Sequence, residues 1–113
     1  MTTSNDNTYN GWTNYPTWNV KLWMDNDQGS YEYWQERAND CFQEAEPQYE
    51  GQTKLDDAIF NLASEIECYY SEYYGEISGL SESPFGDLLG WALNQVNYRE
   101  IAENMLSDLD EVA

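Results

Sequence analysis

The side chains of this sequence that could do chemistry are carboxylates. The chain has 22 Asp and Glu against 4 Lys and Arg, no His, and a formal charge of −18 at pH 7. Histidine titrates nearest to neutral pH, so the usual general base is missing. Two acids beside a groove could still hydrolyse a glycosidic bond, but these acids are spread along predicted helix faces. We therefore expect a protein that is not an enzyme, has no catalytic residues and needs no cofactor.

One acidic cluster faintly resembles a calcium loop. Asp25-Asn26-Asp27-Gln28-Gly29 brings oxygen ligands close together, and Glu36 follows at the twelfth position. An EF-hand needs an oxygen ligand at its fifth position and Gly at its sixth, whereas here they are Gly29 and Ser30. A polar turn before a helix explains the same residues. We expect no metal site, and calcium binding by Asp25 and Asp27 is the weaker alternative.

The cysteines and tryptophans favour structural roles. Cys41 and Cys68 form no C-x-x-C motif and fall on apolar helix positions, which predicts two buried thiols in a reducing cytoplasm, with a disulfide as the weaker alternative. The aromatic stretch of residues 10–29 could stack on sugars, but in a small protein such rings more often form the core. With no signal peptide and no apolar run of membrane length, we expect a cytoplasmic protein that does not contact membranes.

Helical periodicity predicts the elements that must position these side chains. Apolar residues recur at steps of three and four through Thr53–Tyr74, the longest predicted helix, which Thr53 can cap and Gly75 can end. A second helix is predicted over Ser30–Ala45, with Ser30 as its cap and Tyr31 on its buried face. Three more helices are predicted to begin at Asn14 or Thr17, at Ser83-Pro84 and at Asn97. Asn97-x-x-Glu100 matches a capping-box pattern. The expected buried face of the fourth helix is Phe85, Leu88, Leu89, Ala92, Leu93 and Val96, and Ile77 and Leu80 are expected to tuck inward.

The predicted fold is all-α. We expect about five amphipathic helices in one compact acidic domain, residues 11–113, after a disordered tail of residues 1–10. A small irregular hairpin near the N-terminus is left open. The paired tyrosines of the long helix exceed what a small core can bury, so Tyr69, Tyr70, Tyr73 and Tyr74 could form a homodimer contact.

A row of carboxylates marks the second predicted helix. Glu32, Glu36, Asp40 and Glu44 lie four residues apart, about 6 Å along the axis, and drift about 40° per step. Like charges at this spacing destabilise a helix, and exposed faces normally alternate in sign. Since each DNA strand carries a phosphate about every 3.4 Å, the row could imitate phosphates. An ordinary solvated helix face is the alternative.

The net charge restricts the partners. Four cations cannot neutralise a phosphate backbone or an anionic bilayer, so direct binding of nucleic acid or membrane is not expected. Self-repulsion destabilises a compact acidic chain, which suggests that the acidity serves binding to a basic protein. The candidate phosphate-mimicking residues are Glu32, Glu36, Asp40, Glu44, Asp57, Glu65, Glu72, Glu76, Glu103 and Asp108.

Two stretches resemble known families. LDDAIFNLASEIECYYSEYYGEI, residues 55–77, through NYREIAENMLSDLDE, residues 97–111, resembles the overcome-classical-restriction (Ocr) proteins of phages, and the ArdA antirestriction proteins more distantly. Both families imitate duplex DNA and target type I restriction–modification enzymes. The resemblance implies a phage-type inhibitor that occludes a basic DNA groove of a host enzyme. An anti-CRISPR DNA mimic and a non-mimic acidic scaffold are the alternatives. NGWTNYPTWNVKLW also resembles a small acidic phage and prokaryotic family without a known activity.

Overall fold

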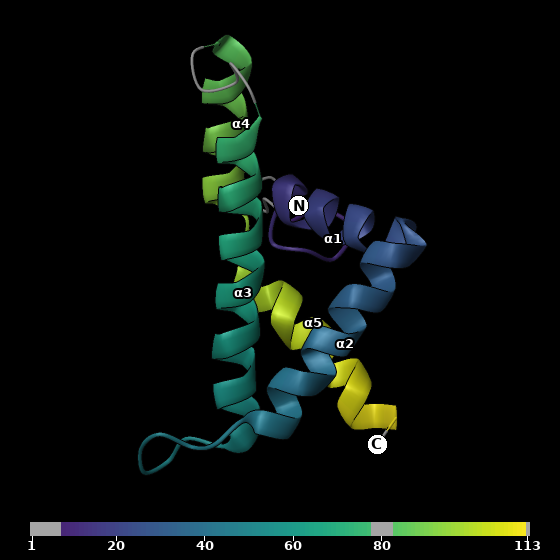
Figure 1. Cartoon of the computed structure of the whole chain (residues 1–113), viewed down its shortest axis with the longest axis vertical. Helices are drawn as coiled ribbons and strands as arrows, with labels where there is room; N and C mark the ends of the chain where they lie inside the picture. Colours follow the sequence, from purple (N-terminus) through teal and green to yellow (C-terminus); the bar gives the residue numbers. More distant parts are fainter. Residues whose placement is uncertain (1–7, 78–82, 113) are drawn as a thin grey trace, which may run out of the picture.

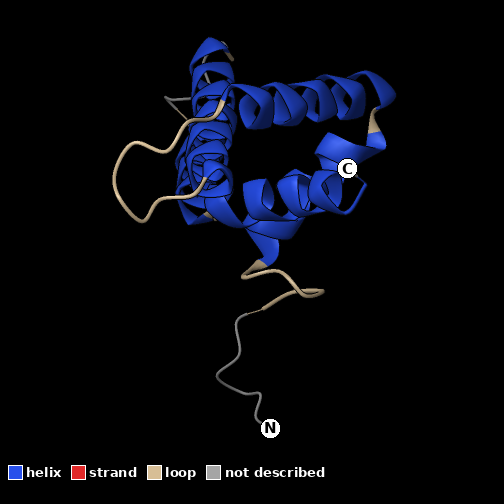
Figure 2. Cartoon of the chain, turned by 90° about the horizontal axis from the view of Figure 1, so that it is seen from below, coloured by secondary structure: helices blue, strands red, loops and turns tan. Residues whose placement is uncertain are grey.

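Five helices make up the regular structure of the part of the chain that can be described. The structure, a computed structural model, describes residues 8–77 and 83–112, and for residues 108–112 only the backbone. The helices are α1 (Tyr15–Asn26), α2 (Gln28–Glu44), α3 (Lys54–Glu76), α4 (Pro84–Gln95) and α5 (Tyr98–Val112). Within these ranges there is no strand, and the rest is loops and turns (Figure 2). The predicted all-α fold is confirmed.

α3 runs the length of the molecule and organises the other helices (Figure 1). α5 and α2 pack mainly against α3, and α5 crosses behind α2. α4 lies beside the C-terminal half of α3, while α1 contacts α2, α4 and α5. The connection of residues 45–53 joins the lower ends of α2 and α3. α1, α2, α3 and α5 therefore surround one interior, and the cap residue of α4, Val96, reaches it.

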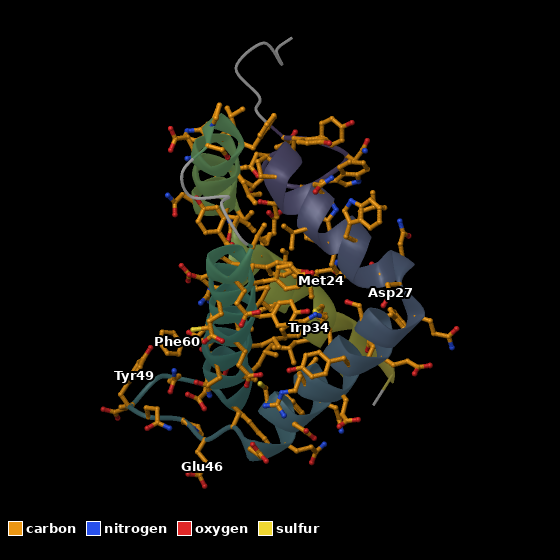
Figure 3. The ribbon with its side chains drawn as sticks, turned by 45° about the horizontal axis from the view of Figure 1, so that its top comes forward. Met24, Asp27, Trp34, Glu46, Tyr49 and Phe60 are labelled. Atoms are coloured by element: carbon orange, nitrogen blue, oxygen red, sulfur yellow. The ribbon has the colours of Figure 1, made fainter. Side chains whose placement is uncertain are left out.

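A single apolar cluster fills that interior. Met24 and Trp34 point inward from α1 and α2 (Figure 3), and Trp34 is the largest side chain of the cluster. α3 supplies the stripe whose periodicity the sequence displays, with Leu62 and Ile66 fully buried. The buried apolar residues are Met24, Trp34, Ala38, Cys41, Ala45, Ala58, Ile59, Leu62, Ile66, Val96, Ile101, Ala102, Met105 and Leu106.

Side-chain caps fix where the helices begin. Thr53 caps α3, and Ser83 caps α4 with Pro84 in its first turn, as predicted. Asp56 completes a reciprocal capping box with Thr53. α1 begins after Asn14, one of the two predicted caps. The prediction that Ser30 caps the second helix is wrong. α2 begins at Gln28, and its cap is Asp27, whose side chain accepts the Ser30 N–H at 2.9 Å.

α3 also ends later than predicted. It continues past Gly75 to Glu76, and Ile77 is the cap, with an extended backbone. The side chain of Ile77 is exposed rather than tucked inward, and Leu80 lies outside the described residues. Tyr31 on α2 is likewise exposed, because the deeper positions of that face are taken by Trp34 and Ala38.

The N-terminal segment forms one tight turn. Tyr9 and Trp12 exchange backbone hydrogen bonds of 2.7 and 2.8 Å around Asn10 and Gly11. Both central residues have positive φ, 49° and 89°, as a type I′ turn requires. The Tyr9 ring lies 4.8 Å from that of Trp18, measured between centroids. Tyr9 and Asn10, which we expected in the tail, thus belong to this turn. The turn is closed by the single bridge between Tyr9 and Trp12 and has no flanking strands among the described residues.

Polar side chains tie this segment to the junction between α4 and α5. Thr17 is fully buried, and its hydroxyl donates to Asn14 at 2.6 Å while accepting the Asn97 backbone N–H at 2.8 Å. Only half of the predicted Asn97–Glu100 capping box forms: Asn97 accepts the Glu100 N–H at 3.0 Å. The Glu100 carboxylate instead accepts the Thr13 N–H at 3.0 Å, since Thr17 already occupies the Asn97 donor.

α4 presents much of its apolar surface to solvent. Of the six positions of its predicted buried face, only Val96, the helix cap, is buried. Phe85, Leu88 and Trp91 are 72%, 66% and 62% exposed. The prediction is wrong because α4 packs on α3 through its glycines: a Cβ on Gly90 would lie 3.4 Å from the Tyr74 hydroxyl oxygen.

Candidate functional site: the acidic face of α2

The carboxylate row lies on the side of α2 that faces away from the core. Trp34, Ala38 and Cys41 anchor the helix, which turns the opposite face outward. The exposed members of the row are Glu32, Glu36 and Glu44; Asp40 is half-buried. Three of the four residues of the predicted row are therefore on the solvent side of α2.

None of the four cations of the chain forms an ion pair with the three exposed carboxylates. Lys21 pairs with Asp25 one helical turn away, and Arg99 pairs with Glu103 at 3.1 Å. Arg37 binds Asp40 and Glu65, and the Lys54 ammonium lies 5.1 Å from the centre of the Phe42 ring. Within the described part of the chain, Glu36 and Glu44 have no polar partner, and Glu32 accepts only a hydrogen bond from Gln28.

Arg37 pairs with two members of the predicted surface. Its guanidinium donates to both carboxylate oxygens of Glu65, at 2.8 and 2.9 Å, and to Asp40 at 3.1 Å. This hydrogen bonding holds the pKa of Glu65 below its usual range, so Glu65 stays ionised and paired. Asp40 and Glu65 are therefore weaker candidates for binding a partner than the sequence alone suggested.

The two cysteines lie in different environments. The Cys41 thiol is buried and donates to Glu65 at 3.3 Å, whereas Cys68 is exposed, so the prediction of two buried thiols is wrong for Cys68. Position 68 lies off the buried stripe of α3, on its solvent side. Burial, then the bond to Glu65, raises the pKa of Cys41 to about 12.

This difference predicts selective alkylation. We expect iodoacetamide at mildly alkaline pH to modify Cys68 in the folded protein and leave Cys41 unmodified, because only the thiolate reacts. In urea both thiols should react. Peptide mass spectrometry of the two samples measures this, and equal labelling of both cysteines in the folded protein would contradict it.

The remaining candidates divide into three groups. Glu72 and Glu76 are exposed on the C-terminal half of α3, with no ion pair in the described part of the chain. Glu103 is paired with Arg99, and the side chain of Asp108 lies outside the described residues. Asp57 has a structural role instead: it is buried and accepts hydrogen bonds from the Glu46 N–H at 3.0 Å and the Asn61 amide at 3.2 Å.

The residues of the calcium-like stretch are engaged in the fold. Asp25 pairs with Lys21, and Asp27 caps α2. In the part of the chain that the structure describes, no group of three or more His, Cys, Asp or Glu side chains could hold a metal ion. The same residues contain no helix with both the length and the apolar run that a bilayer crossing requires.

A family model of unknown function, DUF7249, matches residues 5–112. The chain belongs to this family. No curated protein and no solved structure matches the chain. The family supplies no activity, so the function must be argued from the residues and their positions.

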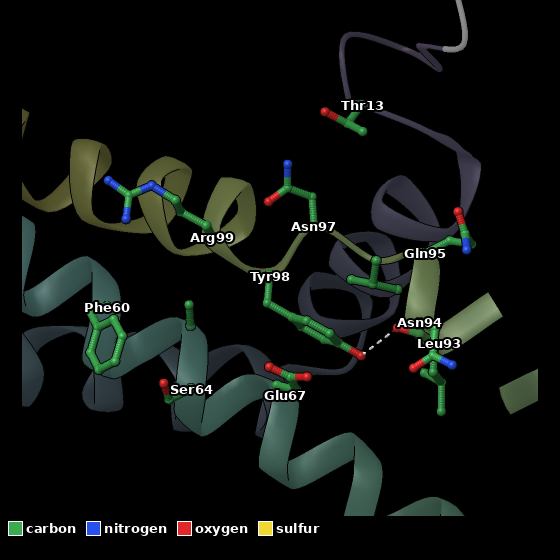
Figure 4. Close-up of a pocket in the computed structure, with 12 residues that line it drawn as sticks. Thr13, Phe60, Ser64, Glu67, Leu93, Asn94, Gln95, Asn97, Tyr98 and Arg99 are labelled. Atoms are coloured by element: carbon green, nitrogen blue, oxygen red, sulfur yellow. Dashed lines mark hydrogen bonds between the residues drawn. The ribbon is translucent and has the colours of Figure 1, made fainter. Parts of the chain in front are cut away.

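An open groove with both polar and apolar lining lies between α3 and the α4–α5 junction (Figure 4). Its volume is about 590 Å³, and Asn94, Gln95 and Asn97 contribute amide side chains. Tyr98 donates to the Leu93 carbonyl at 3.1 Å, and burial, then the charge of Glu67, raises its pKa to about 12. Such a tyrosine stays protonated at neutral pH, so its hydroxyl remains a hydrogen-bond donor.

Proposed function

We propose that this protein is a DNA mimic that inhibits a basic DNA-binding enzyme by occupying its DNA groove. The observation that carries the proposal is the outer face of α2, where Glu32, Glu36 and Glu44 point to solvent while the four cations are engaged elsewhere. A face that served solubility alone would gain from cations at i,i+4 spacing. On this face no Lys or Arg lies four residues from Glu32, Glu36 or Glu44, so that stabilisation is absent.

Binding to a basic groove would recover the lost stabilisation. Carboxylates four residues apart repel one another by about 0.2–0.5 kcal/mol per pair in the free protein. In the complex, each can accept charge-assisted hydrogen bonds from Arg or Lys side chains that normally hold phosphates. The net charge of −18 also attracts a basic partner over a distance, which raises the association rate at low salt.

Type I restriction–modification enzymes are the proposed targets, on the strength of the resemblance to Ocr proteins. CRISPR effectors also hold a duplex in a positively charged channel and are the alternative. Glu72 and Glu76 would extend the contact from α2 onto the exposed end of α3. Inhibition by occlusion requires no catalytic residue.

The test is charge reversal on α2. The variant carries Glu32→Lys, Glu36→Lys and Glu44→Lys, and the control carries Glu50→Lys, Glu67→Lys and Asp87→Lys at exposed positions elsewhere. The measurement is displacement of a labelled duplex from a purified type I restriction enzyme and, separately, from a purified CRISPR effector. We expect the inhibition constant to rise about 100-fold or more for the α2 variant, since each lysine adds repulsion to a lost pair.

The control variant makes the result specific to the face. It has the same net charge as the α2 variant, so it should lose only the long-range attraction and inhibit much better. Inhibition by the wild-type protein should weaken as salt rises. The proposal fails if neither enzyme is displaced by the wild-type protein, or if the two variants inhibit equally.

A further inference from the structure

α4 has two apolar sides, and they differ in how much they contact the rest of the described chain, where α4 packs against α3 and α1. At about 100° per residue, Gly86, Gly90 and Leu93 lie on one side. That side faces α3, where the Tyr74 hydroxyl donates to the Gly86 carbonyl at 2.8 Å. The opposite side is centred on Leu88 and also carries Pro84, Phe85, Trp91, Ala92 and Gln95.

The outward side of α4 is large and apolar. Phe85, Leu88 and Trp91 are each at least 62% exposed, which leaves roughly 400 Å² of apolar side-chain surface. A standard interface buries about 800 Å² per partner, so these three side chains supply about half of one. Small residues turned inward and large apolar residues turned outward are typical of a helix that packs against a second molecule.

The lack of charge on the outward side of α4 favours a second copy of the chain as the molecule that binds there. Asp87 is the single charged residue in the twelve residues of α4, and it lies on the edge rather than on the outward side. Two chains of −18 repel each other wherever their carboxylates meet, and this side keeps carboxylates away from the contact. A basic partner would gain nothing there and would bind the acidic faces instead.

We propose that the protein forms a two-fold symmetric dimer through the outward side of α4. The positions 85, 88 and 91 are evenly spaced, so antiparallel packing of α4 on its copy places Leu88 against the partner's Leu88 near the axis. Phe85 of each copy then meets Trp91 of the other. The contact leaves the acidic row of α2 uncovered and does not depend on the proposed inhibitor function.

The tyrosine contact suggested by the sequence is largely used within the chain. The Tyr69 ring packs edge-on against Trp34 with centroids 5.4 Å apart, and Tyr74 holds α4. Tyr73 is exposed, and Tyr70 is half-buried. The surface of α4 is therefore the larger apolar surface available to a partner.

Sedimentation equilibrium of the full-length protein tests the dimer. At tens of micromolar we expect the mass of two chains for the wild type. Leu88→Glu should raise the dimer dissociation constant about 100-fold or more, because it places two carboxylates together on the axis. Phe60→Glu adds the same charge at an exposed position in the N-terminal half of α3 and should leave the constant within about threefold of the wild type.

Cross-linking locates the contact. In a Cys68→Ser background, Leu88→Cys should give a disulfide-linked dimer under mild oxidation, whereas Phe60→Cys should not. Helical circular dichroism should be unchanged in all variants, since these positions are exposed. A monomeric wild type, or a dimer that Leu88→Glu leaves intact, would overturn the proposal.

Salt separates this proposal from the inhibitor function. The dimer joins two anionic chains, so its dissociation constant should fall as salt screens their repulsion. Inhibition of a basic enzyme should weaken over the same range. A dimer that loosens as salt rises would contradict an apolar contact between like-charged copies, whatever the inhibition assay shows.

Discussion

Replacing Trp34 with Ala is expected to lower the free energy of unfolding by about 3–5 kcal/mol. The side chain is 2% exposed and lies between α2 and α3, with the Tyr33 and Tyr69 rings packed edge-on at centroid distances of 4.9 and 5.4 Å. Alanine would leave a cavity and remove both ring contacts. Since small domains are stable by only about 5–15 kcal/mol, a large share of the stability should be lost.

Trp23→Ala is the matched control for this variant. Trp23 is 63% exposed on α1, so its truncation should cost less than about 1 kcal/mol. Urea unfolding monitored by circular dichroism gives both values. Similar midpoints for the two variants would show that Trp34 does not hold the α2–α3 contact as described.

Thr17→Val is expected to cost about 2–4 kcal/mol despite conserving shape. Valine has nearly the volume of threonine, so no cavity forms, but the hydroxyl that accepts the Asn97 N–H at 2.8 Å is lost. A buried donor left without an acceptor costs about 1–3 kcal/mol, and the bond to Asn14 disappears as well. The Thr17 side chain is fully buried, so water has little access to the position that its hydroxyl leaves.

Thr13→Val separates this effect from a general loss of threonine. Thr13 contributes its backbone N–H to Glu100, and its side chain is exposed, so the variant should unfold within about 0.5 kcal/mol of the wild type. The same urea titration measures both variants. If Thr17→Val is as stable as the wild type, the hydroxyl does not join α1 to the start of α5.

The local signals in the sequence predicted the helices well. Thr53 with Asp56, and Ser83 with Pro84, lie within one turn of the groups they cap, so neighbouring residues suffice to locate those helix starts. The outward position of Glu32 and Glu36 also follows from periodicity, because Trp34 and Ala38 fix the buried side of the same helix. The acidic face was therefore predictable from α2 alone.

The errors concern contacts between distant parts of the chain. Arg37 and Glu65 are 28 residues apart, so periodicity predicts each helix but not the pair that neutralises part of the surface. The apolar pattern of α4 shows that Phe85 and Leu88 share a face, but it cannot distinguish a core from an interface. Asp57 looked like a surface acid because its partner, the Glu46 backbone, lies in a connection without a periodic pattern.

The position of α5 has a consequence for how the chain is made. Ile101, Ala102, Met105 and Leu106 cover the apolar sides of α2 and α3, and the Thr17–Asn97 bond spans 80 residues. While the ribosome is still synthesising α4, the earlier helices therefore have their apolar stripes uncovered and cannot complete a core. Nascent chains in that state are prone to aggregate, and strong mutual repulsion keeps them apart. The same acidity that we propose for binding a basic partner therefore also limits aggregation of the unfinished chain.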